Sequence, residues 1–240
     1  MTAHFRIETA ADDALHLEQA ILIYRSRNRR SLATVHPIGQ HRGKSVVLAG
    51  SAMTAAATRL LAREFAEQDG LAFLPSELLY RGPDLLIWWV PRGVRHLWFR
   101  APALGEAEQG ARVPLPASVF LASARGCRIW SVKGTGRPTP ATPLWRAPYF
   151  NVADDGAICW GNVAVPPALG PERLGEWTAA FFGSHFTHPN AAGKVVRHAG
   201  GAHAFWRAML DGAYRRFPSA VLLPAGMTLG ELADREWRHA

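Results

Sequence analysis

The chain has 240 residues, and 48% of them are hydrophobic, including nine tryptophans and eleven phenylalanines. This apolar content supports a substantial core and excludes a disordered chain, while the length fits a single domain. The formal net charge of +8 comes mainly from arginines that are spread along the chain, so charge alone does not predict a nucleic-acid partner.

The first predicted elements are two strands and a helix. Residues 15–24 and 32–38 are β-rich runs on either side of an arginine-rich turn, so they predict an N-terminal strand pair. Residues 51–68 carry apolar side chains at helical spacing, which predicts a helix with Ser51 as its N-cap.

Two hairpins are predicted within residues 84–133. The first turns at residues 91–93 and the second at residues 124–126, because short glycine-containing turns between β-rich runs are typical of hairpins. Their strands together predict a four-stranded antiparallel meander. Residues 134–148 follow with four prolines, which fix φ and cannot donate to a sheet ladder, so this segment is expected to be extended and irregular.

The C-terminal part of the chain is predicted to be helical, over residues 171–186, 202–217 and 228–239. The last helix has Thr228 and Glu231 in capping-box register. This order of elements predicts an α+β fold. We expect an N-terminal β extension over residues 1–48 that packs on a core domain over residues 49–240, which together form a single compact domain.

Cys127 and Cys159 are the only cysteines, so the chain cannot build a disulfide framework, and neither lies in a metal-type pair. The N-terminus lacks the pattern of a signal peptide, and the longest strongly apolar run, residues 85–90, is too short to span a bilayer. We therefore expect a cytoplasmic protein with reduced thiols and without a metal, a cofactor or a membrane partner. Cys127 lies on a predicted strand and is most simply a structural residue.

The stretch YFNVADDGAICWGN, residues 149–162, follows the proline-rich segment and contains Asn151 and Cys159. A thiolate is a strong nucleophile and a good acyl carrier. An asparagine amide can stabilise the oxyanion of acyl transfer by about 3–4 kcal/mol. A lone cysteine is more often a small buried hydrophobe. The residue types alone therefore leave a catalytic and a structural interpretation of Cys159 open.

The full register of this stretch resembles the ubiquitin-conjugating enzymes. That family carries His-Pro-Asn-Ile, three variable residues and Gly-x-Ile-Cys-Leu, and this chain has YFNV at residues 149–152, ADD, and GAICW at residues 156–160. Asparagine, glycine, isoleucine and cysteine match without gaps. The resemblance implies a UBC-like fold with an N-terminal helix, a four-stranded meander, a flap carrying the active cysteine and C-terminal helices, here with an extra N-terminal strand pair.

Within that superfamily the chain is similar to the divergent prokaryotic branch, and there to the PRTRC system B family. The similarity covers about residues 50–215 and rests on RPTPATPLWRAPYFNV, DDGAICWGN and FFGSHFTHPN. Members of that family are encoded beside a ThiF-like activating enzyme, a small ubiquitin-like protein and a JAB-type protease. The resemblance therefore implies these three proteins as partners.

The resemblance also assigns roles to residues of the site. Cys159 would accept the C-terminal acyl group of the ubiquitin-like protein as a thioester, Asn151 would stabilise the oxyanion, and an amine would be the acceptor. The prokaryotic branch has a characteristic histidine after the cysteine, for which His185 and His188 are candidates. We prefer His188 as the general base or thiol partner, because His185 shares an apolar helix face and has a buried core position as its alternative.

Other interpretations stay open. The chain could be a non-catalytic module that binds a ubiquitin-like protein or a ThiF-like partner. It could be a hydrolase in which His188 and Asn190 assist the cysteine, or it could bind nucleic acid through arginines of residues 25–30. Asp154 and Asp155 could deprotonate an incoming amine or be polar loop residues.

Overall fold

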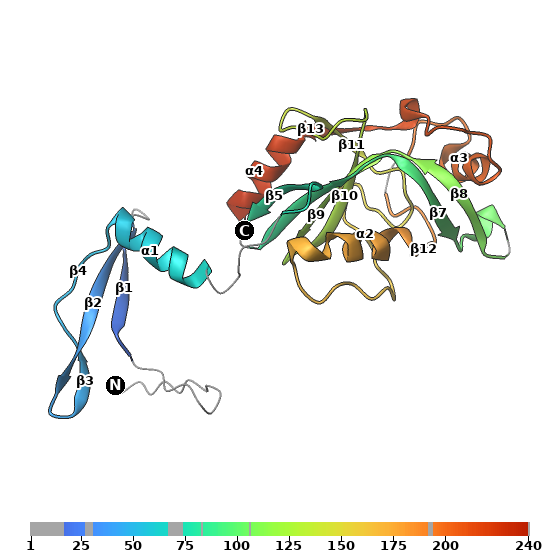
Figure 1. Ribbon diagram of the computed structural model, residues 1–240. Coiled ribbons are helices and arrows are strands. Elements are labelled where there is room, and N and C mark those ends of the chain that lie inside the picture. The colour runs from blue at the N-terminus through green and yellow to red at the C-terminus, as the bar shows by residue number, and fades with distance from the viewer. Residues whose placement is uncertain are drawn as a thin grey trace. The chain divides into compact units, whose positions relative to one another are not determined.

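The structure is a computed structural model, and it describes residues 17–26, 31–66, 74–82, 84–105, 107–191 and 194–239. Its internal contacts divide the chain into two units, residues 1–72 and 73–240 (Figure 1). The sequence predicted a border after residue 48, so helix α1 (Ala55–Ala66) falls in the first unit and not in the second. The packing of the N-terminal strands on the core domain stays a prediction.

The first unit is a small antiparallel sheet followed by α1. Its central strand β2 pairs with all three others, in the elements β1 (Gln19–Arg25), β2 (Ser31–His41), β3 (Lys44–Val47) and β4 (Ser51–Ala52). The predicted strand pair is thus confirmed, and its arginine-rich turn falls largely on residues 27–30, outside the described residues. The predicted cap of the helix is wrong. Ser51 lies in β4, and the hydroxyl of Thr54 accepts the Ala57 N–H at 3.1 Å, because α1 begins four residues later than expected.

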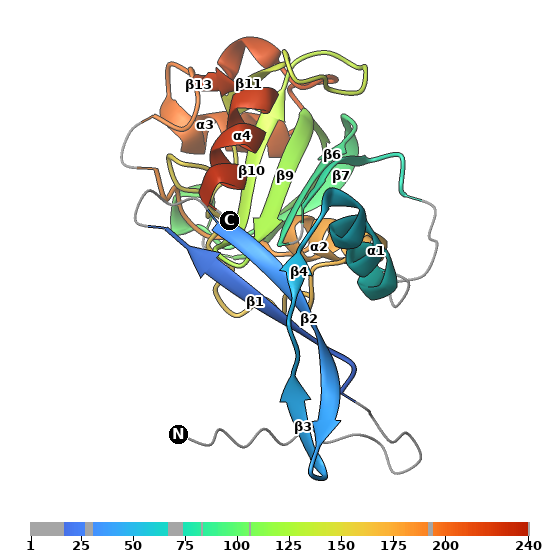
Figure 2. The ribbon, with the colours of Figure 1, turned by 90° about the vertical axis from the view of Figure 1, so that its left-hand side faces the viewer.

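The main sheet of the second unit is antiparallel and has the strand order β13-β11-β10-β9-β6-β5 (Figure 2). Its strands are β5 (Leu78–Gly82), β6 (Leu85–Val90), β9 (Ala117–Ser123), β10 (Gly126–Val132), β11 (Pro143–Arg146) and β13 (Pro224–Thr228). The predicted hairpin at residues 124–126 is confirmed as β9 and β10. The proline-rich segment contains the short strand β11, whose pairing with β13 is irregular between Pro143 and Trp145.

The predicted hairpin with its turn at residues 91–93 is wrong. Strand β6 pairs with β9, whereas β7 (Gly93–Phe99) pairs with β8 (Gln109–Leu115) in a second sheet that also holds β12 (His185–Phe186). Val90 lies opposite Ser118 and Gly93 lies opposite Leu115, so one register runs through both sheets. β6 and β7 are thus the two arms of one bent strand, and β8 and β9 are the arms of its partner.

Prolines explain the bend. Pro91 on one strand and Pro116 on the other lie where the two ladders stop, and a proline has no N–H to donate to a ladder. The chain reverses direction between β7 and β8 and not at residues 91–93. An antiparallel meander does result, but it runs through β5, β6–β7, β8–β9 and β10, and the sequence interpretation missed β5.

Both faces of the main sheet are covered. Helix α4 (Leu229–His239) lies across one face, where Leu229, Leu232 and Ala233 pack on Ile87 and Val119 (Figure 2). On the other face, α2 (Leu174–Phe182), α3 (Gly201–Leu210) and residues 147–152 close a larger, aromatic-rich core. The cysteine stretch therefore enters the molecule on the face that α2 and α3 cover.

The predicted helices differ from the observed ones at their ends. The predicted capping box of α4 is confirmed, since Glu231 Oε2 accepts the Thr228 N–H at 2.8 Å, and these hydrogen bonds lower the pKa of Glu231. Helix α2 stops at Phe182, so His185 lies in β12 and not on a helix. Helix α3 ends seven residues earlier than predicted, before Gly212, whose φ of 76° is left-handed.

Candidate active site

Residues 149–160 form a tight loop, the Cys159 loop, which is fixed to the beginning of β10. Ile158 N–H donates to the Cys127 carbonyl at 3.0 Å, and the Gly156 carbonyl accepts the Ile129 N–H at 2.9 Å. At the base of the loop the Cys159 N–H donates to the Asn151 carbonyl at 2.8 Å. The structure therefore brings the backbones of Asn151 and Cys159 together.

Gly156 is required by the tightness of this loop. Its φ is 86°, a left-handed value that side chains other than glycine rarely adopt. A Cβ atom at this position would lie 2.9 Å from the Ile129 carbonyl oxygen and 3.0 Å from the Trp130 ring. Absence of a side chain thus lets the loop lie directly against β10, which gives a physical reason for the glycine in the matched motif.

Two aromatic side chains embed the start of the loop in the core. Tyr149 and Phe150 are fully buried. Tyr149 contacts the rings of Phe181, Phe182, Phe186 and Trp206. Trp206 also donates its Nε1–H to the Pro148 carbonyl at 2.8 Å. Where ubiquitin-conjugating enzymes have His-Pro, this chain therefore holds its loop by buried aromatic packing.

Asn151 connects the loop to residues 185–188. The Asn151 side chain is buried, its Nδ2 donates to the His185 carbonyl at 2.8 Å, and its Oδ1 accepts the Thr187 N–H at 3.1 Å. Its own N–H donates to the His188 carbonyl at 2.9 Å. Its φ of 60° is left-handed, a conformation that asparagine tolerates. The Asn151 Nδ2 carries two hydrogens, and one of them is donated to the His185 carbonyl. The predicted oxyanion role therefore depends on the second hydrogen.

The two cysteines have opposite surroundings. The Cys159 side chain is exposed at the end of the loop, whereas Cys127 is buried in β10. Burial raises the pKa of the Cys127 thiol to about 12, because a thiolate is poorly solvated in the core. Cys127 thus has the structural position that the sequence predicted, and Cys159 is the thiol that a second molecule can reach.

His188 is exposed, and Thr187 orients its ring. The Thr187 hydroxyl donates its single hydrogen to Asn151 Oδ1 at 2.8 Å, so it can only accept at its contact with His188 Nδ1, 2.9 Å away. His188 therefore carries a hydrogen on Nδ1, and Nε2 is the basic nitrogen of the neutral ring. The sequence interpretation missed Thr187, since a threonine between two histidines has no motif of its own.

His185 is not a buried core residue, which corrects the alternative predicted for it. Its ring is 41% exposed, and Nε2 lies 2.8 Å from Glu108 Oε2. Hydrogen bonding to Arg100, together with the contact to His185, lowers the pKa of the Glu108 carboxyl. His185 thus faces an acidic partner directly before β8, and only its backbone carbonyl reaches Asn151.

The remaining candidates have structural contacts. Asp154 pairs with Arg146, and Asp155 lies 3.7 Å from Arg128 and accepts the Ala157 N–H. Asn190 is not the partner of His188 Nδ1, because Thr187 takes that position. In the described part of the chain, no group of three or more His, Cys, Asp or Glu residues could hold a metal ion. No helix among the described residues is long and apolar enough to cross a bilayer.

The sequence matches the family named prokaryotic E2 family D over residues 53–225. This match spans the Cys159 loop and residues 185–188. The chain belongs to prokaryotic E2 family D. It is accordingly an E2-like protein of the ubiquitin-conjugation type, which is a class of conjugating transferases. Neither the curated proteins nor the solved structures contain a match to the chain.

Proposed function

We propose that the chain is a thioester carrier that accepts a ubiquitin-like protein from a ThiF-like activating enzyme on Cys159 and passes it to an amine. The observation that carries this proposal is the exposed Cys159, held opposite the buried Asn151 by a 2.8 Å backbone hydrogen bond. A protein of prokaryotic E2 family D with an accessible thiol at this position has the group that acyl transfer requires.

The chemistry has two steps. The Cys159 thiolate attacks the C-terminal acyl carbon of the ubiquitin-like protein, and the bond from that carbon to the activating enzyme breaks. An amine then attacks the thioester, loses a proton and displaces Cys159 as a thiolate. Asn151 offers its second amide hydrogen to the oxyanion of both steps. His188 accepts the proton of the amine on Nε2, the nitrogen that Thr187 leaves free.

A UBC-like fold and membership of the PRTRC system B family are part of the same proposal. The antiparallel meander, the cysteine loop after it and the helices that follow occur in the order known for ubiquitin-conjugating enzymes. A small ubiquitin-like protein, a ThiF-like enzyme and a JAB-type protease are then the partners. Genes for all three beside the gene for this chain would support this assignment, and their absence would argue against it.

Incubation with the activating enzyme, ATP and the ubiquitin-like protein tests the proposal. Wild type should form an adduct that a reducing agent removes, Cys159→Ala should form none, and Cys127→Ala is the control that keeps the adduct. If wild type forms no adduct while the activating enzyme itself is charged, the chain is a binding module for one of these proteins instead of a carrier.

Single-turnover discharge of the adduct to an amine separates the roles of the other residues. Asn151→Ala should still be charged and should discharge about 10²–10³ times more slowly, as expected for a lost oxyanion donor. Asn162→Ala is its matched control, because it makes the same change at an exposed asparagine just after the loop and should discharge like wild type. Discharge of Asn151→Ala at the wild-type rate would exclude the oxyanion role.

The two histidines are distinguished by their tautomers and by discharge. Nitrogen-15 NMR of the histidine rings should show His188 with a hydrogen on Nδ1 in wild type and in Thr187→Ser, and a mixture of tautomers in Thr187→Val. His188→Ala should slow discharge, whereas His185→Ala should leave it near the wild-type rate. The reverse order of the two variants would identify His185 as the base.

A further inference from the structure

We propose that a second binding surface, an arginine-lined pocket at the far end of β10, takes an acidic peptide segment of a partner protein. The pocket has a volume of about 300 Å³ and is lined by Arg92, Leu115, Val132, Arg215, Arg216 and Phe217, among others. This volume lies at the lower end of the range for ligand-binding pockets. We call it the arginine pocket.

The arginine pocket is separate from the Cys159 site. The Cys159 loop is bonded to β10 at Cys127 and Ile129, near the beginning of the strand, and the pocket is lined by Val132 and Gly134 at its end. Five residues of strand separate Cys127 from Val132, which corresponds to about 17 Å. Binding in this pocket therefore requires neither the thiol nor the proposed transfer reaction.

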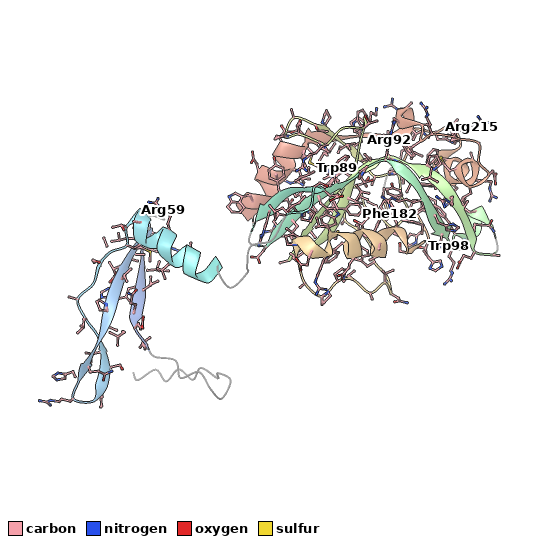
Figure 3. The ribbon with its side chains drawn as sticks, viewed as in Figure 1. Arg59, Trp89, Arg92, Trp98, Phe182 and Arg215 are labelled. Atoms are coloured by element: carbon pink, nitrogen blue, oxygen red, sulfur yellow. The ribbon has the colours of Figure 1, made fainter. Side chains whose placement is uncertain are left out.

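The bend of the long strands opens this pocket. Arg92 follows Pro91 at the break between β6 and β7, and Pro116 lies at the matching break between β8 and β9. Arg215 and Arg216 come from the segment after α3. Arg92 and Arg215 are labelled on the same unit in Figure 3, and both line the pocket. Residues distant in the sequence thus meet where the sheet ladder is interrupted.

Within the described part of the chain, no acidic side chain neutralises the charge of the arginine pocket. Arg92, Arg215 and Arg216 are exposed, and none of them has an ion pair or hydrogen bond with another described residue. No aspartate or glutamate is among the described residues that line the pocket. A guanidinium pairs with a carboxylate through two parallel hydrogen bonds, so these three groups are ready to bind carboxylates.

The floor of the pocket favours a peptide over a small anion or a nucleic acid. Val94, Leu115, Val132 and Phe217 make it apolar, and Ser219 is the one polar uncharged side chain among the described residues that line the pocket. Free phosphate, or the sugar–phosphate backbone of DNA, would place hydrated groups against this floor. An extended peptide with alternating acidic and apolar residues places carboxylates at the arginines and apolar side chains on the floor, because alternate side chains of a strand point to opposite sides.

Fluorescence anisotropy of the full chain with a short labelled peptide that alternates glutamate and leucine tests the proposal. We expect saturable binding that Arg92→Glu and the double variant Arg215→Glu/Arg216→Glu each weaken at least about tenfold. Arg59→Glu is the matched control, because Arg59 is an exposed arginine of α1 with the same charge change, and it should bind like wild type (Figure 3). A peptide with glutamine in place of glutamate should not bind measurably.

Three results would overturn the proposal. Equal losses in Arg59→Glu and in the pocket variants would mean attraction to net charge alone. Equal binding of the glutamine peptide would exclude carboxylate recognition. Tighter binding of duplex DNA or inorganic phosphate through the same arginines would assign the pocket to phosphate. Unchanged melting temperature and unchanged labelling of Cys159 in the pocket variants show that they fold and that the candidate active site is intact.

Discussion

The two halves of the Cys159 loop differ sharply in their surroundings. Residues 149–152 lie in the core, where Tyr149 and Phe150 have no exposed surface. Residues 153–160 are exposed or half-buried except for Gly156, and Cys159 is exposed. The difference teaches how an irregular segment can present a reactive group at a fixed position. Packing of residues 149–152 in the core orders the loop, and the exposure of Cys159 lets a second molecule reach its thiol.

The largest expected effect is on thiol reactivity. A disulfide reagent should label Cys159 in native protein, while Cys127 should react more than about a thousandfold more slowly near neutral pH. Burial raises the pKa of Cys127 to about 12, and the thiolate is the reactive form. Labelling rates of Cys127→Ala and Cys159→Ala check this. Fast labelling of native Cys159→Ala would contradict the buried position of Cys127.

The same pKa shift predicts how stability depends on pH. The thiol of Cys127 titrates at about 12 when folded and at about 8.5 when unfolded, so the neutral form favours the folded state. Its contribution is complete below pH about 8.5 and is lost as the pH rises toward 12. The free energy of unfolding, measured with urea, should therefore fall more steeply with rising pH in wild type than in Cys127→Ala. An equal pH dependence of the two proteins would exclude this linkage.

The next largest effect is the loss of stability when a buried side chain of the loop is removed. Phe150→Ala should lower the free energy of unfolding by about 3–5 kcal/mol, because it removes a fully buried ring that packs on Phe99 and His203. Trp237→Ala is the control, since that ring is 60% exposed and should cost little. Denaturant unfolding measures both, and equal losses would show that the loop is not anchored in the core.

A smaller effect is expected at Gly156, where the loop lies directly against β10. Gly156→Ala should cost about 1–3 kcal/mol, because φ is left-handed and the new Cβ meets the Ile129 carbonyl. Gly161 has a φ of 55°, and a Cβ added there would meet no other atom within 4 Å, so Gly161→Ala tests the φ alone and should cost less. Melting temperatures of the two variants check the difference, and a larger loss in Gly161→Ala would contradict it.

The smallest effect belongs to the exposed half. Arg146 pairs with Asp154, but both side chains are more than a third exposed. Exposed ion pairs are screened by water and salt, so Arg146→Gln should change the free energy of unfolding by less than about 1 kcal/mol. Denaturant unfolding at low and high salt measures this. A loss as large as that of Phe150→Ala would mean that charge, and not burial, orders the loop.

Much of the fold could be predicted from local patterns. Hydrophobic runs located most of the strands, and Thr228 with Glu231 located the start of α4 correctly. The turn assigned to residues 91–93 failed because a proline followed by a glycine is typical both of turns and of breaks in a strand. The pairing of β6 with β9 distinguishes a strand break from a turn, and local sequence patterns do not predict this pairing.

The site was predictable to the same extent. The resemblance to the ubiquitin-conjugating enzyme motif predicted that Asn151 acts together with Cys159, and the two residues share a backbone hydrogen bond within one short loop. The contact from Asn151 to Thr187 joins residues that are 36 positions apart, and no local sequence pattern predicts such a contact. Local patterns also did not predict that Tyr149 packs against Phe186 and Trp206, because these residues are distant from Tyr149 in the sequence.

The unbroken register of the bent strands has a consequence for folding. Because one register serves both sheets, strand pairing that begins between β7 and β8 can continue residue by residue into the pairing of β6 with β9. A slip by one residue would turn Trp88 and Phe99 away from the core together. The two sheets therefore depend on one register, which is set where β7 connects to β8, and Glu108 of this connection also contacts His185 beside the candidate active site.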